Sequence, residues 1–268
     1  MKLRLVASLL AIVVGLTSCE TKPKAAPRTA AAHTAGSPKH PASANIRWAQ
    51  ARTTKPRALR VVATNGFVEP VEREGGAFAA HGANDGVSFA GTDRKAAKIT
   101  IASAPVEHIA LADLVAELSA QENAMLHHNP AIAKNAGSGR VAEENRNVTV
   151  DGWIHFAKKE SDNDYHVILG STDDPSEAVL MNVEVSGLPP HNSTAFAKLS
   201  SARTAFEDTF LDSLHSGGSY TQFEPVHVRI TGSLFFDIDH AAGVVGPNNF
   251  RPQTAWEIHP VTKIVFAN

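Results

Sequence analysis

The sequence lacks several features that would assign it to a class directly. Its 268 residues include a single cysteine, Cys19, so no disulfide can form within the chain. Aromatic residues make up only 6% of it, which leaves few stacking platforms for single-stranded nucleic acid. No apolar run reaches the ~20 residues that a membrane-spanning helix needs. A Gly-rich phosphate loop, a nucleophile elbow and an HExxH zinc motif are also missing.

The first residues have the pattern of an export signal. Lys2 and Arg4 precede an apolar run at residues 5–16, and small residues follow it, as in a secretory signal peptide. The run Leu16-Thr-Ser-Cys19 resembles the lipobox of bacterial lipoproteins, in which the cysteine is lipidated and becomes the mature N-terminus. The resemblance implies a signal peptide at 1–18, lipidation of Cys19 with chains such as palmitate, and the membrane as a partner through that lipid.

The residue after the cysteine bears on localisation. Lipoprotein sorting of the enteric type retains proteins with Asp at this position in the inner membrane, whereas this chain has Glu20. The expected location is therefore the bacterial cell envelope, with the outer membrane favoured over the inner one and the domain on the periplasmic side or the surface. The alternative is an ordinary secreted protein with an incidental cysteine.

Residues 19–57 predict a disordered basic tether. Ala, Pro, Ser and Thr dominate this stretch, and its large apolar residues are few, so it cannot bury enough surface to offset its ordering entropy. Eight Lys and Arg residues occur between Thr21 and Arg57 without one acidic residue. Such a segment beside a lipid anchor is attracted to anionic head groups, although a plain soluble spacer remains the alternative.

The rest of the chain is acidic. Residues 58–268 contain 15 Lys and Arg against 26 Asp and Glu, a formal charge of −11 that the whole-chain value of −2 conceals. A strongly acidic domain lacks the basic surface that supplies most nucleic-acid affinity. Nucleic acid is therefore an unlikely partner.

Residues 58–146 predict an accessory α+β region. Strands are expected at Leu59–Ala63 and Lys98–Ala102. Apolar residues at helical spacing predict a helix from about Val106 to His127, which Asn129-Pro130 ends. This region forms either a small layer packed on the main domain or a weakly ordered arm.

Residues 147–268 predict a mainly β domain. Period-two alternation of apolar and polar residues predicts five strands, and a helix is expected from about Asn192 to Leu214 between the third and the fourth. Three strands, a helix and two strands is the order of the OB-fold, a five-stranded barrel. The expected strands cover residues 148–156, 164–169, 179–185, 226–234 and 258–265.

The same stretch resembles a domain of uncharacterised bacterial secreted proteins. The motifs that carry the resemblance are Gly152-Trp-Ile-His with Asp164-Tyr-His166, Phe235-Phe-Asp237 with His240, and Glu257-Ile-His-Pro260. The resemblance covers about residues 147–266 and implies no activity.

Polar side chains from several strands are the candidate functional residues. Asp164 and His166 lie two apart on one expected strand, so both project from the same face, and Glu257 and His259 repeat this arrangement. Carboxylates and imidazoles that converge suit a divalent metal site or acid–base chemistry, whereas surface ion pairs on a solvated face are the alternative. The candidate ligand or catalytic cluster is Asp164, His166, Glu184, Asp237, His240, Glu257 and His259.

Two functions follow from these patterns. The first is an envelope lipoprotein whose OB-like module binds an unidentified envelope polymer, peptide or protein. The second is a metal-dependent hydrolase that acts through the His and carboxylate cluster, so the sequence leaves open whether the protein is an enzyme.

Overall fold

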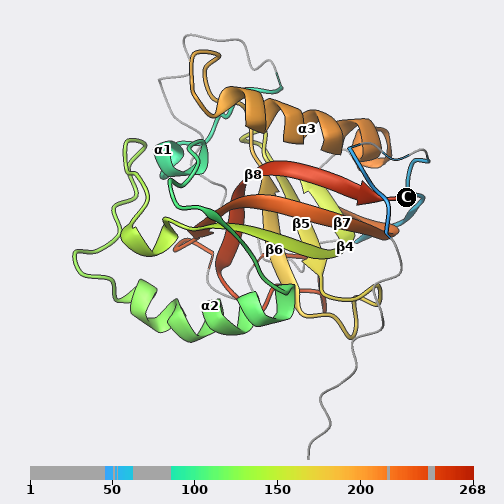
Figure 1. Cartoon of the computed structure of the whole chain (residues 1–268), viewed down its shortest axis with the longest axis horizontal. Coiled ribbons are helices and arrows are strands. Elements are labelled where there is room, and N and C mark those ends of the chain that lie inside the picture. The colour runs from blue at the N-terminus through green and yellow to red at the C-terminus, as the bar shows by residue number, and fades with distance from the viewer. Residues whose placement is uncertain (1–45, 51, 53, 63–85, 216–217, 241–244) are drawn as a thin grey trace, which may run out of the picture. The chain divides into compact units, whose positions relative to one another are not determined.

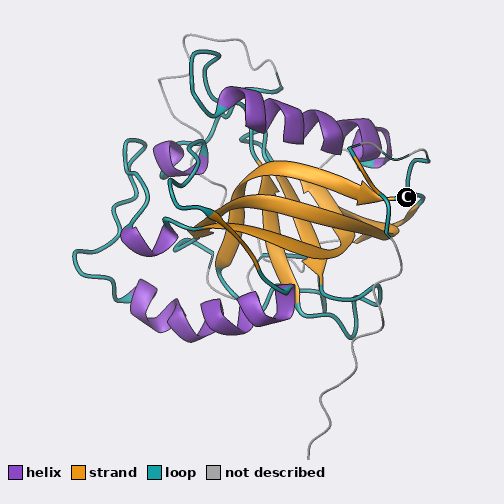
Figure 2. Cartoon of the chain, in the orientation of Figure 1, coloured by secondary structure: helices purple, strands orange, loops and turns teal. Residues whose placement is uncertain are grey.

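The structure is a computed structural model that describes residues 46–50, 52, 54–62, 86–215, 218–240 and 245–268. The predicted signal peptide, Cys19 and most of the predicted tether lie outside these residues. Ala44–Asn268 form one compact unit, whose described part is α+β and mainly β (Figures 1 and 2). The strands are β1 Trp48–Ala49, β2 Ala58–Val62, β3 Val106–His108, β4 Asn147–Lys159, β5 Tyr165–Gly170, β6 Leu180–Val185, β7 Tyr220–Phe236 and β8 Trp256–Ala267. The helices are α1 Lys95–Lys98, α2 Leu111–Leu126 and α3 Phe196–Phe210, with 3₁₀ turns at Ala142–Glu144 and Leu211–Ser213.

All eight strands belong to one sheet, in which the five long strands form a closed circuit. β4 pairs with β5, β5 with β6, β6 with β8, β8 with β7, and β7 again with β4. Every pair in this circuit is antiparallel except β6 and β8, which are parallel. β3 adds to β4 in parallel, and the short strands β1 and β2 pair with β8 and β7.

The apolar core follows from the period-two alternation of the five long strands. Alternate side chains such as Val148, Val167, Val183 and Ile258 point to one side and are fully buried there. α3, which follows β6 in the chain, contributes side chains including Phe206 to this core. Figure 1 shows α2 and α3 on opposite sides of the strands, and α2 adds Leu114 and Leu118 among others. Each such burial is worth about 1.5–3 kcal/mol.

Gly232 allows two of these strands to approach closely. A Cβ at this position would lie 2.5 Å from Cγ2 of Ile258 and 2.6 Å from the carbonyl oxygen of Pro260. The register of β7 against β8 shifts at Gly232. The absence of a side chain is therefore what lets the two strands pair here.

The predicted strands and the predicted helix of the main domain are confirmed with small changes of bounds. Residues 148–156 pair with residues 226–234 as part of the antiparallel β4–β7 pair. None of the helices in the described part of the chain has both the length and the apolarity that a membrane crossing needs.

Two predicted elements before residue 147 differ from the structure. Lys98–Ala102 is not a strand, because Lys98 ends α1 and the amides of Ile99 and Thr100 donate to the carbonyls of Lys95 and Ala97. Side chains satisfy the Ala102 backbone: Ser233 Oγ accepts from its amide, and Asn147 Nδ2 donates to its carbonyl. The helix predicted from Val106 begins only at Leu111, since Val106–His108 pair with β4 as β3.

The last part of the predicted tether also contains ordered structure. Trp48 and Ala49 pair with β8, and the Trp48 ring lies 5.1 Å from the His227 ring and 4.5 Å from the Arg229 guanidinium. Aromatic and cation–π contacts therefore hold a segment whose composition predicted disorder.

Candidate functional site

The seven predicted cluster residues come together in the structure. On β5, β6 and β8, the side chains of His166, Glu184, Glu257 and His259 point away from the apolar core, because each alternates with core residues. Asp164 stands immediately before β5. Each of the seven is at most 5% exposed, so the alternative of ion pairs on a solvated face is wrong.

The face that carries the cluster is covered by residues far away in the sequence. Residues 86–102 lie across it: the Phe89 amide donates to the Leu188 carbonyl, and Ser186 Oγ donates to the Lys98 carbonyl. The segment after β7 covers the other part, where the Gln253 amide donates to the Leu180 carbonyl. These two covers explain the burial of a face that carries the polar cluster beside a smaller apolar group with Ile168 and Leu180.

One group of ligand-type side chains consists of Asp164, Glu184 and His259. Nδ1 of His259 lies 2.8 Å from Oε2 of Glu184, and Nε2 of the same ring lies 3.3 Å from Oδ2 of Asp164. The other carboxylate oxygen of Asp164 accepts a hydrogen bond from the Gly187 amide. One atom from each residue lies within 4.8 Å of the other two.

A second group consists of Asp237, His240 and Glu257. The carboxylate of Asp237 accepts hydrogen bonds from the backbone amides of Asp239 and His240 and contacts Nδ1 of the His240 ring. These amides fix the carboxylate at the end of β7. One atom from each of the three residues again lies within 4.8 Å of the other two.

Asn182 links the two groups and was not predicted from the sequence. Its Nδ2 donates to Oε1 of Glu184 at 3.0 Å and to Oε1 of Glu257 at 2.8 Å. Asn182 is two residues before Glu184 on the same strand, so the alternation that selected Glu184 could also have selected it. Nε2 of His166 lies 2.8 Å from Oε1 of Glu184, and Nδ1 of the same ring lies 3.3 Å from Glu160, which was also missed.

Several buried atoms of the cluster make no well-directed hydrogen bond with any described residue. They are both ring nitrogens of His259, Oδ2 of Asp164, Nδ1 of His166, Oε2 of Glu257 and Nε2 of His240. Several of these atoms lie against opposite charges, as in the 2.8 Å contact between Nδ1 of His259 and Glu184, so they are ion-paired without well-directed hydrogen bonds. Ligand atoms that surround one cation lie close together without pointing at each other, up to about 4–5 Å apart for bonds of ~2.1–2.4 Å.

The imidazoles of the cluster are strongly basic when no cation is bound. Burial lowers the pKa of His166, but the carboxylates of Glu184 and Glu160 outweigh burial and raise it to about 10. Burial also lowers the pKa of His240, but the Asp237 carboxylate outweighs burial and raises the pKa to about 9. Burial likewise lowers the pKa of His259, yet Glu184 and Asp164 hold this pKa well above its usual value.

The carboxyl groups divide into two kinds. Burial raises the pKa of Asp164 to about 7, with help from Asp162, and burial together with Glu184 raises that of Glu257 to about 7. Burial alone would also raise the pKa of Glu184, but the neighbouring imidazoles of His166 and His259 lower it well below the usual value. The cluster therefore holds several protons near neutral pH that a cation would displace.

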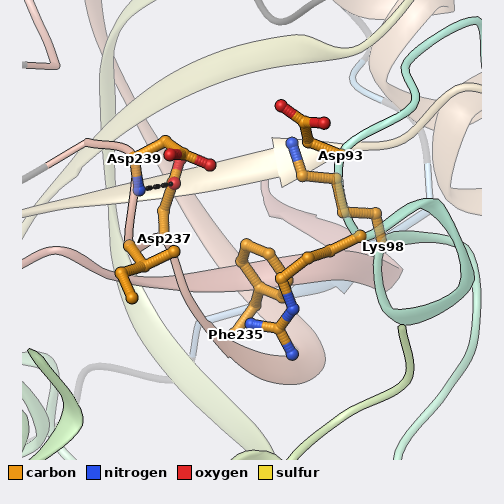
Figure 3. Close-up of a pocket in the computed structure, with 7 residues that line it drawn as sticks. Asp93, Lys98, Phe235, Asp237 and Asp239 are labelled. Atoms are coloured by element: carbon orange, nitrogen blue, oxygen red, sulfur yellow. Dashed lines mark hydrogen bonds between the residues drawn. The ribbon is translucent and has the colours of Figure 1, made fainter. Parts of the chain in front are cut away.

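A small cavity borders the second group. It has a volume of about 10 Å³, which is room for about one water molecule. Figure 3 shows Asp93 and Lys98 on one side of it and Asp237 and Asp239 on the other, with Phe235 beside them. Lys98 is 3% exposed, and its ammonium group lies 5.7 Å from the centre of the Phe235 ring.

Each of the two groups offers ligand atoms that could hold a metal ion. Each group combines two carboxylates with one imidazole. This mixture of oxygen and nitrogen ligands suits Mn²⁺, Fe²⁺ or Zn²⁺, whereas Ca²⁺ prefers oxygen ligands alone. Fold alone would not establish a function. Comparison of the chain with protein-family models, curated proteins and solved structures found no match.

Proposed function

We propose that this protein is a lipid-anchored protein of the bacterial envelope whose OB-like module binds a divalent metal ion through Asp164, Glu184 and His259. The observation that carries the proposal is the His259 ring. It is fully buried between two carboxylates, and neither of its nitrogens makes a well-directed hydrogen bond with a described residue. A cation would satisfy a ring nitrogen and the orphaned oxygen of Asp164 together.

The OB-like character is supported by how the strands pair. The circuit β4–β5–β6–β8–β7 returns to β4. Its third and fifth strands in chain order, β6 and β8, are parallel, and α3 lies between β6 and β7 in the chain. This agrees with the element order of an OB barrel. The cluster then lies on the outer face of β5, β6 and β8.

The envelope location is supported by the lipobox-like Leu16-Thr-Ser-Cys19 and the basic residues that follow it. An unidentified envelope polymer, peptide or protein is the proposed partner of the module. A groove of about 310 Å³ on β3, β4, β7 and β8 supports this. Lys263 lines it together with Arg229, whose charge is already paired with Asp151.

Metal analysis of the full-length protein tests the proposal. The protein is purified in detergent, stripped with a chelator and titrated calorimetrically with Mn²⁺, Zn²⁺ and Ca²⁺. We expect Mn²⁺ or Zn²⁺ to bind more tightly than Ca²⁺, and we expect His259→Gln with Asp164→Asn to abolish binding at this position. His108→Gln, which removes an exposed imidazole, is the matched control and should bind as the wild type does. Absence of binding in the correctly folded wild type would refute the proposal.

A metal-dependent hydrolase is the second candidate. The observation that favours it is a cavity with room for about one water molecule, which Asp237 of the cluster and Lys98 line. A divalent cation would lower the pKa of such a water and make it a nucleophile. Turnover of a panel of phosphate and carboxylate esters that requires added metal would support this candidate, and its absence would leave the binding module.

A further inference from the structure

We infer that Asp237, His240 and Glu257 form a second divalent-cation position beside the first, so that the centre is dinuclear. This inference rests on the proposed binding of a cation by Asp164, Glu184 and His259, and it adds a metal stoichiometry and a second set of ligands.

The second group repeats the composition of the first. Each has two carboxylates and one imidazole, with one atom per residue inside a 4.8 Å limit. His240 and Glu257 are 4% and 2% exposed, and Nε2 of His240 and Oε2 of Glu257 make no well-directed hydrogen bond with any residue that the structure describes. Buried atoms without a well-directed hydrogen bond therefore occur in this group as well as in the first.

The two groups are direct neighbours. Nδ1 of His259 lies 2.8 Å from Oε2 of Glu184 and 3.8 Å from Oε2 of Glu257, although these carboxylates belong to different groups. Asn182 donates to both carboxylates and is paired with Glu257 across the parallel strands β6 and β8. The spacing is compatible with two-metal sites, in which the ions are ~3.5–4 Å apart.

Charge balance is compatible with two cations. The two groups place four carboxylates, Asp164, Glu184, Asp237 and Glu257, in a region where none is more than 4% exposed. Buried charges need compensation of opposite sign, and two divalent cations balance four carboxylates. The buried Lys98 ammonium also faces Glu184 and Asp237, so the metal stoichiometry is a quantity for experiment.

The second position is also preorganised. The backbone amides of Asp239 and His240 hold the Asp237 carboxylate before any cation arrives. Asn182 does the same for one oxygen of Glu257 and leaves the other oxygen available. A ligand set with locked side chains binds its cation at a lower entropic cost.

Metal stoichiometry and electron paramagnetic resonance test the inference on the full-length protein in detergent. The protein is stripped with a chelator, loaded with Mn²⁺ and freed of excess metal, and its bound metal is measured by elemental analysis. The wild type should hold two Mn²⁺ per chain, with a broadened, spin-coupled spectrum. His240→Gln should reduce the content by half and restore the spectrum of isolated Mn²⁺. Asp113→Asn, an exposed carboxylate on α2, should retain both ions.

The outcomes separate the two proposals. A wild type that holds one Mn²⁺, retains it in His240→Gln and loses it in Asp164→Asn would overturn the second position and leave the first. A wild type that holds none would overturn both. The spin-coupled spectrum requires no variant, so the inference stays testable if His240→Gln does not fold. An uncoupled spectrum at two equivalents would overturn the dinuclear arrangement.

Discussion

The buried ion pair between Arg94 and Glu144 should control how firmly residues 86–102 cover the site. Nη1 and Nη2 of Arg94 donate to Oε1 and Oε2 of Glu144 at 2.7 and 2.6 Å, and the two side chains are only 2% and 0% exposed. Glu144 also accepts hydrogen bonds from the amides of Val141 and Phe236. Glu144→Gln retains the shape of the side chain but removes its charge.

The expected loss is large because the Arg94 guanidinium stays buried without a counter-charge. Removing one partner of a buried pair costs about 3–5 kcal/mol, and for a unit of this size about 2–4 °C of melting temperature is lost per kcal/mol. We therefore expect Glu144→Gln to lower the melting temperature by roughly 6–20 °C. Asp151→Asn is the matched control, because Arg229 also binds Asp151 through two nitrogens but the side chains are 36% and 43% exposed. Such a pair contributes only about 0–1 kcal/mol.

Chemical and thermal unfolding of the metal-free protein, followed by circular dichroism, measures both variants. Adding Arg94→Met to Glu144→Gln should recover part of the loss, since it removes the unpaired charge. If Glu144→Gln costs no more than Asp151→Asn, or if the double variant is less stable than Glu144→Gln alone, the reasoning about uncompensated burial is refuted.

Three other outcomes are expected. Metal affinity should rise from pH 6 to pH 8 in calorimetry, because the raised pKa of His259 keeps its ring protonated and a cation must displace that proton; equal affinities would contradict this. Cys19→Ala should release the protein from membranes or leave it unprocessed in fractionation, and unchanged membrane association would argue against the lipid anchor. Gly232→Ala should lose about 1–3 kcal/mol of unfolding free energy in urea, the cost of overpacking a core, because its Cβ would lie 2.5 Å from Ile258; Gly139→Ala, where nothing lies within 4 Å, is the control.

The main domain could be predicted because its elements follow local periodicity. Alternation assigned β4, β7 and β8 correctly, and the same alternation separated Asp164 and His166 from Tyr165 and Val167. Prediction was wrong where short segments depend on distant partners. Ile-Thr-Ile after Lys98 has the pattern of a strand, but Ser233 and Asn147, remote in the chain, satisfy the Ala102 backbone instead.

For the site, the sequence could predict which residues take part but not how they contact one another. The residue types and their faces were readable from the chain, but Asn182 and Glu160 were missed because they acquire importance through contacts across strands. Burial was not predictable either. A polar strand face normally indicates solvent, and here residues 86–102 and the segment around Gln253 cover it.

The sequence by itself determined the type of each long element, the face of each strand side chain and the acidic charge of residues 58–268, since these depend on spacing and composition alone. Only the tertiary structure decided that β7 pairs with both β4 and β8, that His259 lies between Asp164 and Glu184, and that this polar face is closed off from water. The physical reason is that strand pairing and burial join residues far apart in the chain, and no local period encodes which distant segment will cover which face.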